Sequence, residues 1–195
     1  MKCCGVMAKA LKNILLICFV VSLAGCGGHS TVYHDKNMDF GAIHAVAVLP
    51  FVTLQGGSNS AEMLRDDLMN SLMATGAFYV VPSGEVAHGI AISGMQNPAQ
   101  PTVDDVKKFC SLEKVNAVIT GVVKEFGSIG SGATSSNEIS VNLQMIEGQT
   151  GRVVWSADTT LGGVTIFDRL FGGGAQPMDN ISQKAVNDLI KKLFM

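Results

Sequence analysis

The chain has 195 residues, a formal net charge of −2 and a mean hydropathy of +0.32. Its 47% hydrophobic and 15% charged residues exclude a disordered chain, and the small negative charge excludes the basic face that nucleic-acid binding requires. Five cysteines are too few for a disulfide scaffold of this length. The length predicts one domain with a sizeable core, and the positive hydropathy makes a membrane segment or anchor the first feature to look for.

Residues 1–25 have the pattern of a bacterial lipoprotein signal. A basic start (Lys2, Lys9 and Lys12) precedes an 11-residue apolar run over 14–24, which is too short to span a membrane but typical of a secretory signal. Leu23-Ala24-Gly25-Cys26 follows and is similar to the lipobox. The alternative is an ordinary signal peptide with a chance cysteine, but the order of these features favours the lipobox. We therefore expect cleavage between Gly25 and Cys26 and acylation of the Cys26 thiol.

Removing 25 of the 195 residues would leave a mature chain of 170, anchored by lipid without crossing the membrane. Gly27 resembles the lipoprotein class sorted to the outer membrane, so we expect its periplasmic face, with the inner membrane as the alternative. Besides Cys26, only Cys110 then remains, and we expect it to be a small buried hydrophobe. Residues 26–41 predict a lipidated N-terminus and short flexible tether, and residues 42–195 a periplasmic domain.

The first half of this domain alternates strands and helices. The expected elements are a buried strand over 45–51, a helix from Asn59 or Ser60 to about Thr75, a strand over 78–81, a short helix near 85–90, a helix after a Thr102–Asp105 capping box, and a buried strand over 117–123. The first helix has a stripe of Ala61, Leu64, Leu68 and Leu72, and Arg65, Asp66 and Asn70 are expected to face away from it. This alternation favours parallel strands joined by crossovers.

The second half predicts a hairpin and a closing helix. A flexible loop is expected over 126–136, a half-buried strand over 137–147, a turn over 147–151, and a partner strand over 153–161 with Val153, Trp155 and Ala157 on one face. A glycine-rich segment over 162–176 precedes a last helix, for which Asp179 is the expected cap. The predicted fold class is α/β (α+β), a single domain whose mixed five-stranded sheet is flanked by helices.

The sequence has no recognisable catalytic, nucleotide-binding or metal-binding pattern. A nucleophile elbow, a phosphate loop and a His/Cys metal spacing are all missing from the mature chain. Asp66-Asp67 and Asp104-Asp105 are expected to be solvated helix acids, and the latter pair suits a helix N-terminus. We therefore predict no enzyme activity, no cofactor, no metal and no small-molecule substrate; a hydrolase using His44 or His88 is the alternative.

One glycine-bounded segment is a candidate interaction loop. It combines apolar side chains with one arginine, a mixture that protein interfaces favour: Ile166, Phe167, Arg169, Leu170 and Phe171. The alternative is a mobile loop closed by its own small hydrophobic staple.

Three motifs together resemble a family of bacterial envelope proteins. They are Val46-Ala47-Val48-Leu49-Pro50-Phe51, Asn116-Ala117-Val118-Ile119-Thr120-Gly121 and Thr150-Gly151-Arg152-Val153-Val154-Trp155-Ser156. In order and spacing behind a lipobox they look like the superfamily of the curli secretion channel subunit, the penicillin-binding-protein activator lipoproteins and the N-terminal domain of the Tol translocation protein. Asn116 replaces the family's usual Asp. The resemblance covers nearly all of the mature domain.

This resemblance implies a lipid-anchored, non-enzymatic periplasmic domain that binds envelope proteins or assembles into rings. We expect an assembly, scaffold or accessory subunit of an envelope complex, possessing a membrane anchor and envelope-protein partners and forming a homo-oligomer. The alternative is a regulatory lipoprotein that activates a peptidoglycan synthase, which the short tether disfavours. A channel-forming subunit is disfavoured because the strand over 137–147 is needed for the core sheet, and a hydrolase is disfavoured most.

Overall fold

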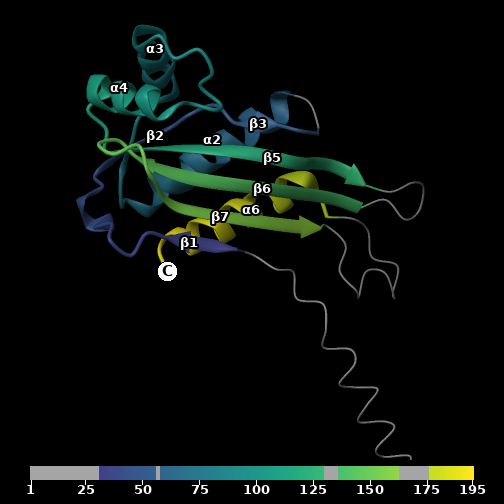
Figure 1. The fold of residues 1–195 in the computed structure, drawn as a ribbon. Helices are drawn as coiled ribbons and strands as arrows, with labels where there is room; N and C mark the ends of the chain where they lie inside the picture. The colour runs from purple at the N-terminus through teal and green to yellow at the C-terminus, as the bar shows by residue number, and fades with distance from the viewer. Residues whose placement is uncertain (1–30, 56–57, 130–135, 163–175) are drawn as a thin grey trace, which may run out of the picture.

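A computed structural model describes residues 31–55, 58–129, 136–162 and 176–195, and within them one mixed sheet carries helices on both faces (Figure 1). The strands are β1 (Val32–His34), β2 (Ala45–Val48), β3 (Val52–Thr53), β4 (Tyr79–Val80), β5 (Ala117–Ile129), β6 (Ser136–Glu147) and β7 (Val153–Gly162). The helices are the 3-10 turn η1 (Phe40–Ala42) and the α-helices α2 (Ser58–Thr75), α3 (Ser83–Ser93), α4 (Val103–Glu113) and α6 (Met178–Leu193). The predicted single-domain α/β class is confirmed.

The sheet has a parallel half and an antiparallel half, as predicted. Its strand order is β1-β7-β6-β5-β2-β4, and β3 pairs with β5. β2 runs parallel to β4 and β5, and β3 also runs parallel to β5. From β5 through β6 and β7 to β1, every pairing is antiparallel. The described residues thus form seven strands where five were expected, and the two additions are β1 and β3.

β3 arises because proline interrupts the first predicted strand. β2 pairs with β5 as far as Val48, and the Leu49 N–H still donates to the Ile119 carbonyl oxygen at 2.8 Å. Pro50 has no N–H to donate, and pairing with β5 resumes at Val52. The run expected over 45–51 is therefore divided into two short strands.

Two hydrophobic clusters lie on opposite faces of the sheet. One is packed under α2 and α6 and includes Val46 and Val48 of β2, and the other is packed under α3 and α4 and includes Ala47 and Leu49. Consecutive residues of β2 therefore alternate between two cores, as the continuous apolar run predicted. Figure 1 shows that α3 and α4 sit over one end of the sheet, while the long strands β5, β6 and β7 continue past them.

The apolar stripe of α2 is confirmed, but Arg65 does not face solvent. Leu64, Leu68 and Leu72 are buried, and so is Arg65, which is only 6% exposed. Its Nε and Nη2 atoms donate to the Val48 carbonyl oxygen at 3.0 and 2.9 Å. The prediction was wrong because the long arginine stem extends from the edge of the stripe and its guanidinium satisfies a strand-end carbonyl.

The tether expectation is wrong for residues 31–41. Val32–His34 forms the edge strand β1 against β7, and Phe40–Ala42 forms η1, which the Asp39 side chain caps by accepting from the Gly41 N–H. The three residues of β1 have polar neighbours and are too few to show a periodic pattern of their own. Their strand conformation is instead set by hydrogen bonding to β7, which the local sequence does not encode.

Three helix expectations had different outcomes. The Thr102–Asp105 capping box is confirmed at the start of α4, with both reciprocal hydrogen bonds present. The short helix expected near 85–90 is longer, so His88 lies within α3 and not in a loop. Asp179 is not the cap of α6, because that position is taken by Pro177 without a side-chain hydrogen bond.

The hairpin strands differ from expectation in length and in one register. Residues 126–129, expected as loop, extend β5 opposite β6, while residues 130–135 lie outside the described part. In β7, Trp155 pairs with Met145 whereas Val153 pairs with Ile146, so Val154 is an extra residue. Because of this bulge, Val153 packs against the α3–α4 cluster while Trp155 packs under α6, not on one face as predicted.

Candidate interaction surfaces

The residues singled out in advance for lipidation and contact are not among those described. Outside the described ranges lie the cleavage pair Gly25 and Cys26 and the loop residues Ile166, Phe167, Arg169, Leu170 and Phe171. Their roles therefore remain predictions. Among the helices that are described, none has the length and apolar character needed to cross a membrane.

The strand next to the predicted anchor is firmly paired. The Thr31 N–H donates to Asp158 Oδ1 at 2.7 Å, and the Asp158 N–H donates to the Thr31 carbonyl oxygen at 3.2 Å. At the other end of β1, the Asp35 N–H donates to the Val154 carbonyl oxygen at 2.8 Å. The described chain is therefore paired to the sheet from Thr31 onward, and Thr31 is five residue steps from Cys26 in the sequence.

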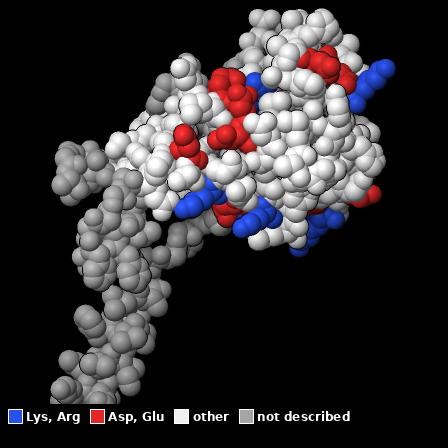
Figure 2. Space-filling model, turned by 180° about the vertical axis from the view of Figure 1, so that it is seen from behind, with Lys and Arg blue, Asp and Glu red and all other residues white. Residues whose placement is uncertain are grey.

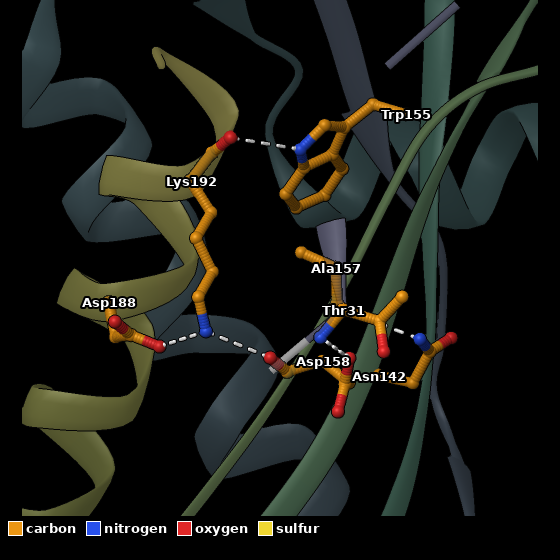
Figure 3. A network of polar contacts seen from close by, with 7 residues as sticks. All are labelled: Thr31, Asn142, Trp155, Ala157, Asp158, Asp188 and Lys192. Atoms are coloured by element: carbon orange, nitrogen blue, oxygen red, sulfur yellow. Dashed lines mark hydrogen bonds and ion pairs between the residues drawn. The ribbon is translucent and has the colours of Figure 1, made fainter. Parts of the chain in front are cut away.

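A buried lysine joins the C-terminal helix to the same strand pair (Figure 3). Lys192 Nζ forms an ion pair with the Asp188 carboxylate and donates to the Asp158 carbonyl oxygen at 2.9 Å. Its own carbonyl oxygen accepts from Trp155 Nε1 at 3.2 Å. Burial alone would raise the pKa of Asp188, but hydrogen bonds from Lys192 and Thr159 and the nearby lysine charges outweigh it and hold that pKa below its ordinary value.

One face of the antiparallel half carries a polar hollow beside α3 and α4. Thr120, Asn142 and Gln144 line it together with the segment 99–101, around a volume of about 270 Å³. Asn142 Nδ2 donates to the Ala157 carbonyl oxygen at 3.3 Å, and Thr120 Oγ1 donates to that of Ala99 at 3.2 Å. The lining residues are uncharged, so this surface presents neutral hydrogen-bonding groups.

Further along the same face, two carboxyl groups lie close together. Glu125 of β5 and Glu138 of β6 are near neighbours, because Glu125 pairs with Ser140 and Gly127 with Glu138. Burial, a hydrogen bond with Glu125 and repulsion from its charge raise the pKa of Glu138. The pair adds negative charge to this face of the sheet, on which Asp158 also lies.

An aromatic hollow lies at the end of the molecule that contains the C-terminus. Phe40, Phe78 and Phe194 line a space of about 320 Å³ with His44. The rings of Phe78 and Phe194 are stacked with centroids 5.6 Å apart, and Tyr79 on the edge strand β4 is 60% exposed. Exposed aromatic groups are typical of protein interfaces. Sequence reasoning missed this surface because its rings come from three segments with no shared local pattern.

Cys110 is a core thiol, as predicted. It is buried against the turn between β6 and β7. A Cβ added to Gly148 in this turn would lie 2.6 Å from the Cβ of Cys110. Burial, with a smaller effect from the Glu147 charge, raises the pKa of the thiol to about 12. A thiol of that pKa is not a nucleophile at neutral pH. Glu147 instead closes the turn, accepting from the Gln149 and Thr150 N–H groups.

The two candidate histidines lie on different elements. His44 precedes β2 and borders the aromatic hollow, and His88 is in α3 in the layer over the other sheet face. Across the described ranges, no group of three or more His, Cys, Asp or Glu is arranged to hold a metal ion. Asn116 Oδ1 accepts from the His44 and Ala45 N–H groups at 2.9 Å each and fixes the start of β2 beside β5.

The charged surface is mixed in sign on the side shown in Figure 2. Acidic side chains gather near the middle of this face, and basic side chains lie below them, on a surface that is mostly uncharged. No broad basic patch is seen on that side among the described residues. Contacts made there would therefore depend on local pairs and apolar groups more than on one dominant field.

The structure defines an α/β domain in which helices cover one face of the sheet and leave the other face partly open. No family model and no curated protein match the chain. Among solved structures, it is similar to the PelC dodecamer from Paraburkholderia phytofirmans (TM-score 0.58, 14% identity, covering 85% of this chain and 96% of that one). It is also similar to lipoprotein GNA1162 from Neisseria meningitidis (TM-score 0.56, 15% identity, covering 77% and 98%).

A third similar structure is the hypothetical protein CT253 from Chlamydia trachomatis (TM-score 0.52, 11% identity, covering 78% of this chain and 96% of that one). At identities this low, the matches establish a shared fold. The expected fold is thereby confirmed, since the chain and lipoprotein GNA1162 share an architecture over nearly all of the latter.

Proposed function

We propose that this protein is a lipid-anchored subunit of a bacterial cell-envelope assembly that acts by binding other proteins at the periplasmic face of the outer membrane. The observation that carries the proposal is the pairing of β1 with β7, because the paired part of the chain begins only five residue steps after the predicted acylation site. Shared fold with a lipoprotein supports the anchor, and shared fold with a dodecamer supports association of several copies.

A binding role also fits the chemistry of the described surfaces. The buried thiol is unreactive and the two histidines are apart, whereas the aromatic hollow and the polar hollow offer two kinds of contact surface. Partners at the same membrane are favoured over a synthase in the other membrane. The five residue steps from Cys26 to Thr31 span at most about 18 Å. The fifteen residues 27–41 of the expected tether would span about 50 Å.

The anchor is tested by expressing the full chain and measuring its intact mass and membrane partition. We expect a mature chain that begins at Cys26 with a diacylglycerol mass increment and remains with the membranes. Cys26→Ser should abolish both, while the matched control Cys18→Ser, inside the predicted signal, should change neither. An unmodified Cys26 in membrane-free protein would contradict the proposal.

The assembly role is tested on the acylated protein itself. Native mass spectrometry in detergent should show species of more than one subunit. Crosslinking in cells, with a reagent that does not react with cysteine, should join copies of the chain to each other. A protein that stays monomeric over the accessible concentration range would remove the homo-oligomer from the proposal. Tyr79→Ser and Phe194→Ser, compared with the exposed control Met63→Ser on α2, would show whether the aromatic end contributes.

A further inference from the structure

The central strands extend past the point where the anchored segment joins the sheet. Thr31 is hydrogen-bonded to Asp158, which pairs with Asn142, and Asn142 pairs with Val122 of β5. β5 continues from there to Ile129, opposite six residue steps of β6 from Asn142 to Ser136, with one extra residue of β5 at the register shift between Val123 and Glu125. At about 3.3 Å per residue this overhang is about 20 Å long. We define the overhang as residues 125–129 of β5, 136–140 of β6 and 160–162 of β7.

The chain leads back from Thr31 in the direction of this overhang. β1 is antiparallel to β7, so the N-terminal end of β1 points toward the end at which β7 stops. The five residue steps to Cys26 span at most about 18 Å, which is less than the overhang. An acyl group on Cys26 is therefore unable to lie beyond the end of the overhang, and a membrane that holds the acyl group is brought to that end.

The side chains of the overhang suit a water–lipid boundary. On one face, Phe126 pairs with Ile139 and Ile139 with Leu161, and Phe126 and Leu161 are only partly covered by the core. On the other face, Glu125, Ser140 and Thr160 form a polar row, and Glu138 lies beside Glu125 on the same face. An amphipathic edge of this kind places apolar groups against acyl chains and polar groups against headgroups and water.

The opposite parts of the molecule are turned away by the same geometry. β4 is five strand positions from β1 across the sheet, a distance of about 24 Å at about 4.8 Å per strand. The α3–α4 layer lies over that half of the sheet (Figure 1). The α3–α4 layer is therefore distant from the strand at which the tether begins.

We propose that the overhang of β5, β6 and β7 rests on the membrane surface and that α3 and α4 face the periplasm. This inference rests on the proposed acylation of Cys26. It identifies a lipid surface as the occupant of one end of the domain and leaves the α3–α4 side for protein partners.

The test compares two labelled sites in the acylated full chain. Ser128→Cys places a thiol on the exposed part of the overhang, and Leu112→Cys places one on the exposed part of α4. Each is combined with Cys110→Ala, so that a thiol-reactive fluorophore has one target. The protein is placed in vesicles of phosphatidylethanolamine and phosphatidylglycerol that contain a headgroup nitroxide lipid. The label at residue 128 should lose most of its fluorescence, and the label at residue 112 should keep it.

A long Gly/Ser insertion after Gly28 is the matched control, because a flexible tether frees the domain from the surface. It should restore the fluorescence at residue 128 without changing circular dichroism. Equal quenching at the two sites, or stronger quenching at residue 112, overturns the proposed orientation. If the intact mass shows that Cys26 is not acylated, both the anchor and the orientation fall; if Cys26 is acylated and quenching is equal, only the orientation does.

Discussion

The parallel and antiparallel halves of the sheet bury their strands differently. In β2, Val46, Ala47 and Val48 are all fully buried, because helices cover both faces of the parallel half. In β7, Trp155 and Ala157 are buried under α6, while Asp158 and Thr160 lie on the face that no described helix covers. A strand buried on both sides contributes mainly to stability, and a strand with one open face also provides surface for contacts.

This difference separates the scaffold from the surface that is available for binding. The parallel half supplies most of the second core cluster, whereas the antiparallel half carries β1, the overhang and the polar hollow. Substitutions in the parallel half should therefore act through folding. Exposed substitutions in the antiparallel half should act through association or membrane contact.

The largest predicted effect is in the doubly covered half. Phe109→Ala removes a side chain with no exposed surface from the α3–α4 cluster, and we expect it to lower the free energy of unfolding by about 3–5 kcal/mol. The control Gln144→Ala, on the open face, should change it by less than about 0.5 kcal/mol. Urea unfolding measures both. Equal effects would mean that the open face is covered in the folded protein and would break the comparison.

The second prediction concerns the link between α6 and β7. Lys192→Ala removes the buried ammonium from Asp188 and from the Asp158 carbonyl oxygen, and we expect a loss of about 1–3 kcal/mol. The adjacent, exposed Lys191→Ala should have little effect. Because the pKa of Asp188 lies below its ordinary value of 3.8, its ionised form stabilises the fold above that pH and this contribution is lost as pH falls through the folded pKa.

The difference between the Lys192 and Lys191 variants should therefore be largest at neutral pH and shrink in acid. A difference that does not change between pH 7 and pH 3 would show that the Lys192 ion pair does not contribute as described.

The third prediction is smaller and concerns the helix that covers the parallel half. Thr102→Ala breaks the capping box of α4, and we expect a cost of about 1 kcal/mol. Ser111→Ala, exposed in the body of the same helix, is the control and should be nearly neutral. Thermal unfolding followed by circular dichroism distinguishes them, and a Thr102 variant as stable as the control would show that the cap contributes nothing.

The smallest predicted effect is a gain in the antiparallel half. Glu138→Gln removes a carboxyl group whose pKa is raised by burial and by Glu125, while its amide still donates to Glu125. A raised carboxyl pKa destabilises the fold where the group is ionised, so the variant should melt slightly higher at pH 7. The gain should vanish as pH falls below the ordinary value of 4.5. A lower melting temperature at pH 7 would contradict the assignment.

Much of the fold was predictable because local and tertiary preferences agree in it. The β2 run, the capping box at Thr102 and the alternation of β6 each carry a strong pattern that the structure retains. The departures share a different cause. β1, the burial of Arg65 and the bulge at Val154 all depend on a hydrogen-bonding partner that is distant in the sequence, so no window of neighbouring residues encodes them.

The interaction surfaces were less predictable for the same reason. Phe40, Phe78 and Phe194 are brought together by η1, β4 and the end of α6, and only the folded chain shows that they form one hollow. The predicted anchor, by contrast, is a purely local pattern around Cys26, which the sequence alone can carry. Whether the loop containing Arg169 makes contacts remains a prediction that the proposed crosslinking addresses.

The pairing of β1 also determines how force would pass between the membrane and the domain. A pull on the lipid acts along β1, at right angles to its hydrogen bonds with β7, so these bonds are loaded in shear and resist together. From β7 the load passes through the Asp158 carbonyl oxygen to Lys192 and into α6. The proposed anchor would thus be joined to the sheet through β1, and a force on the lipid would be spread over the fold before any strand separates.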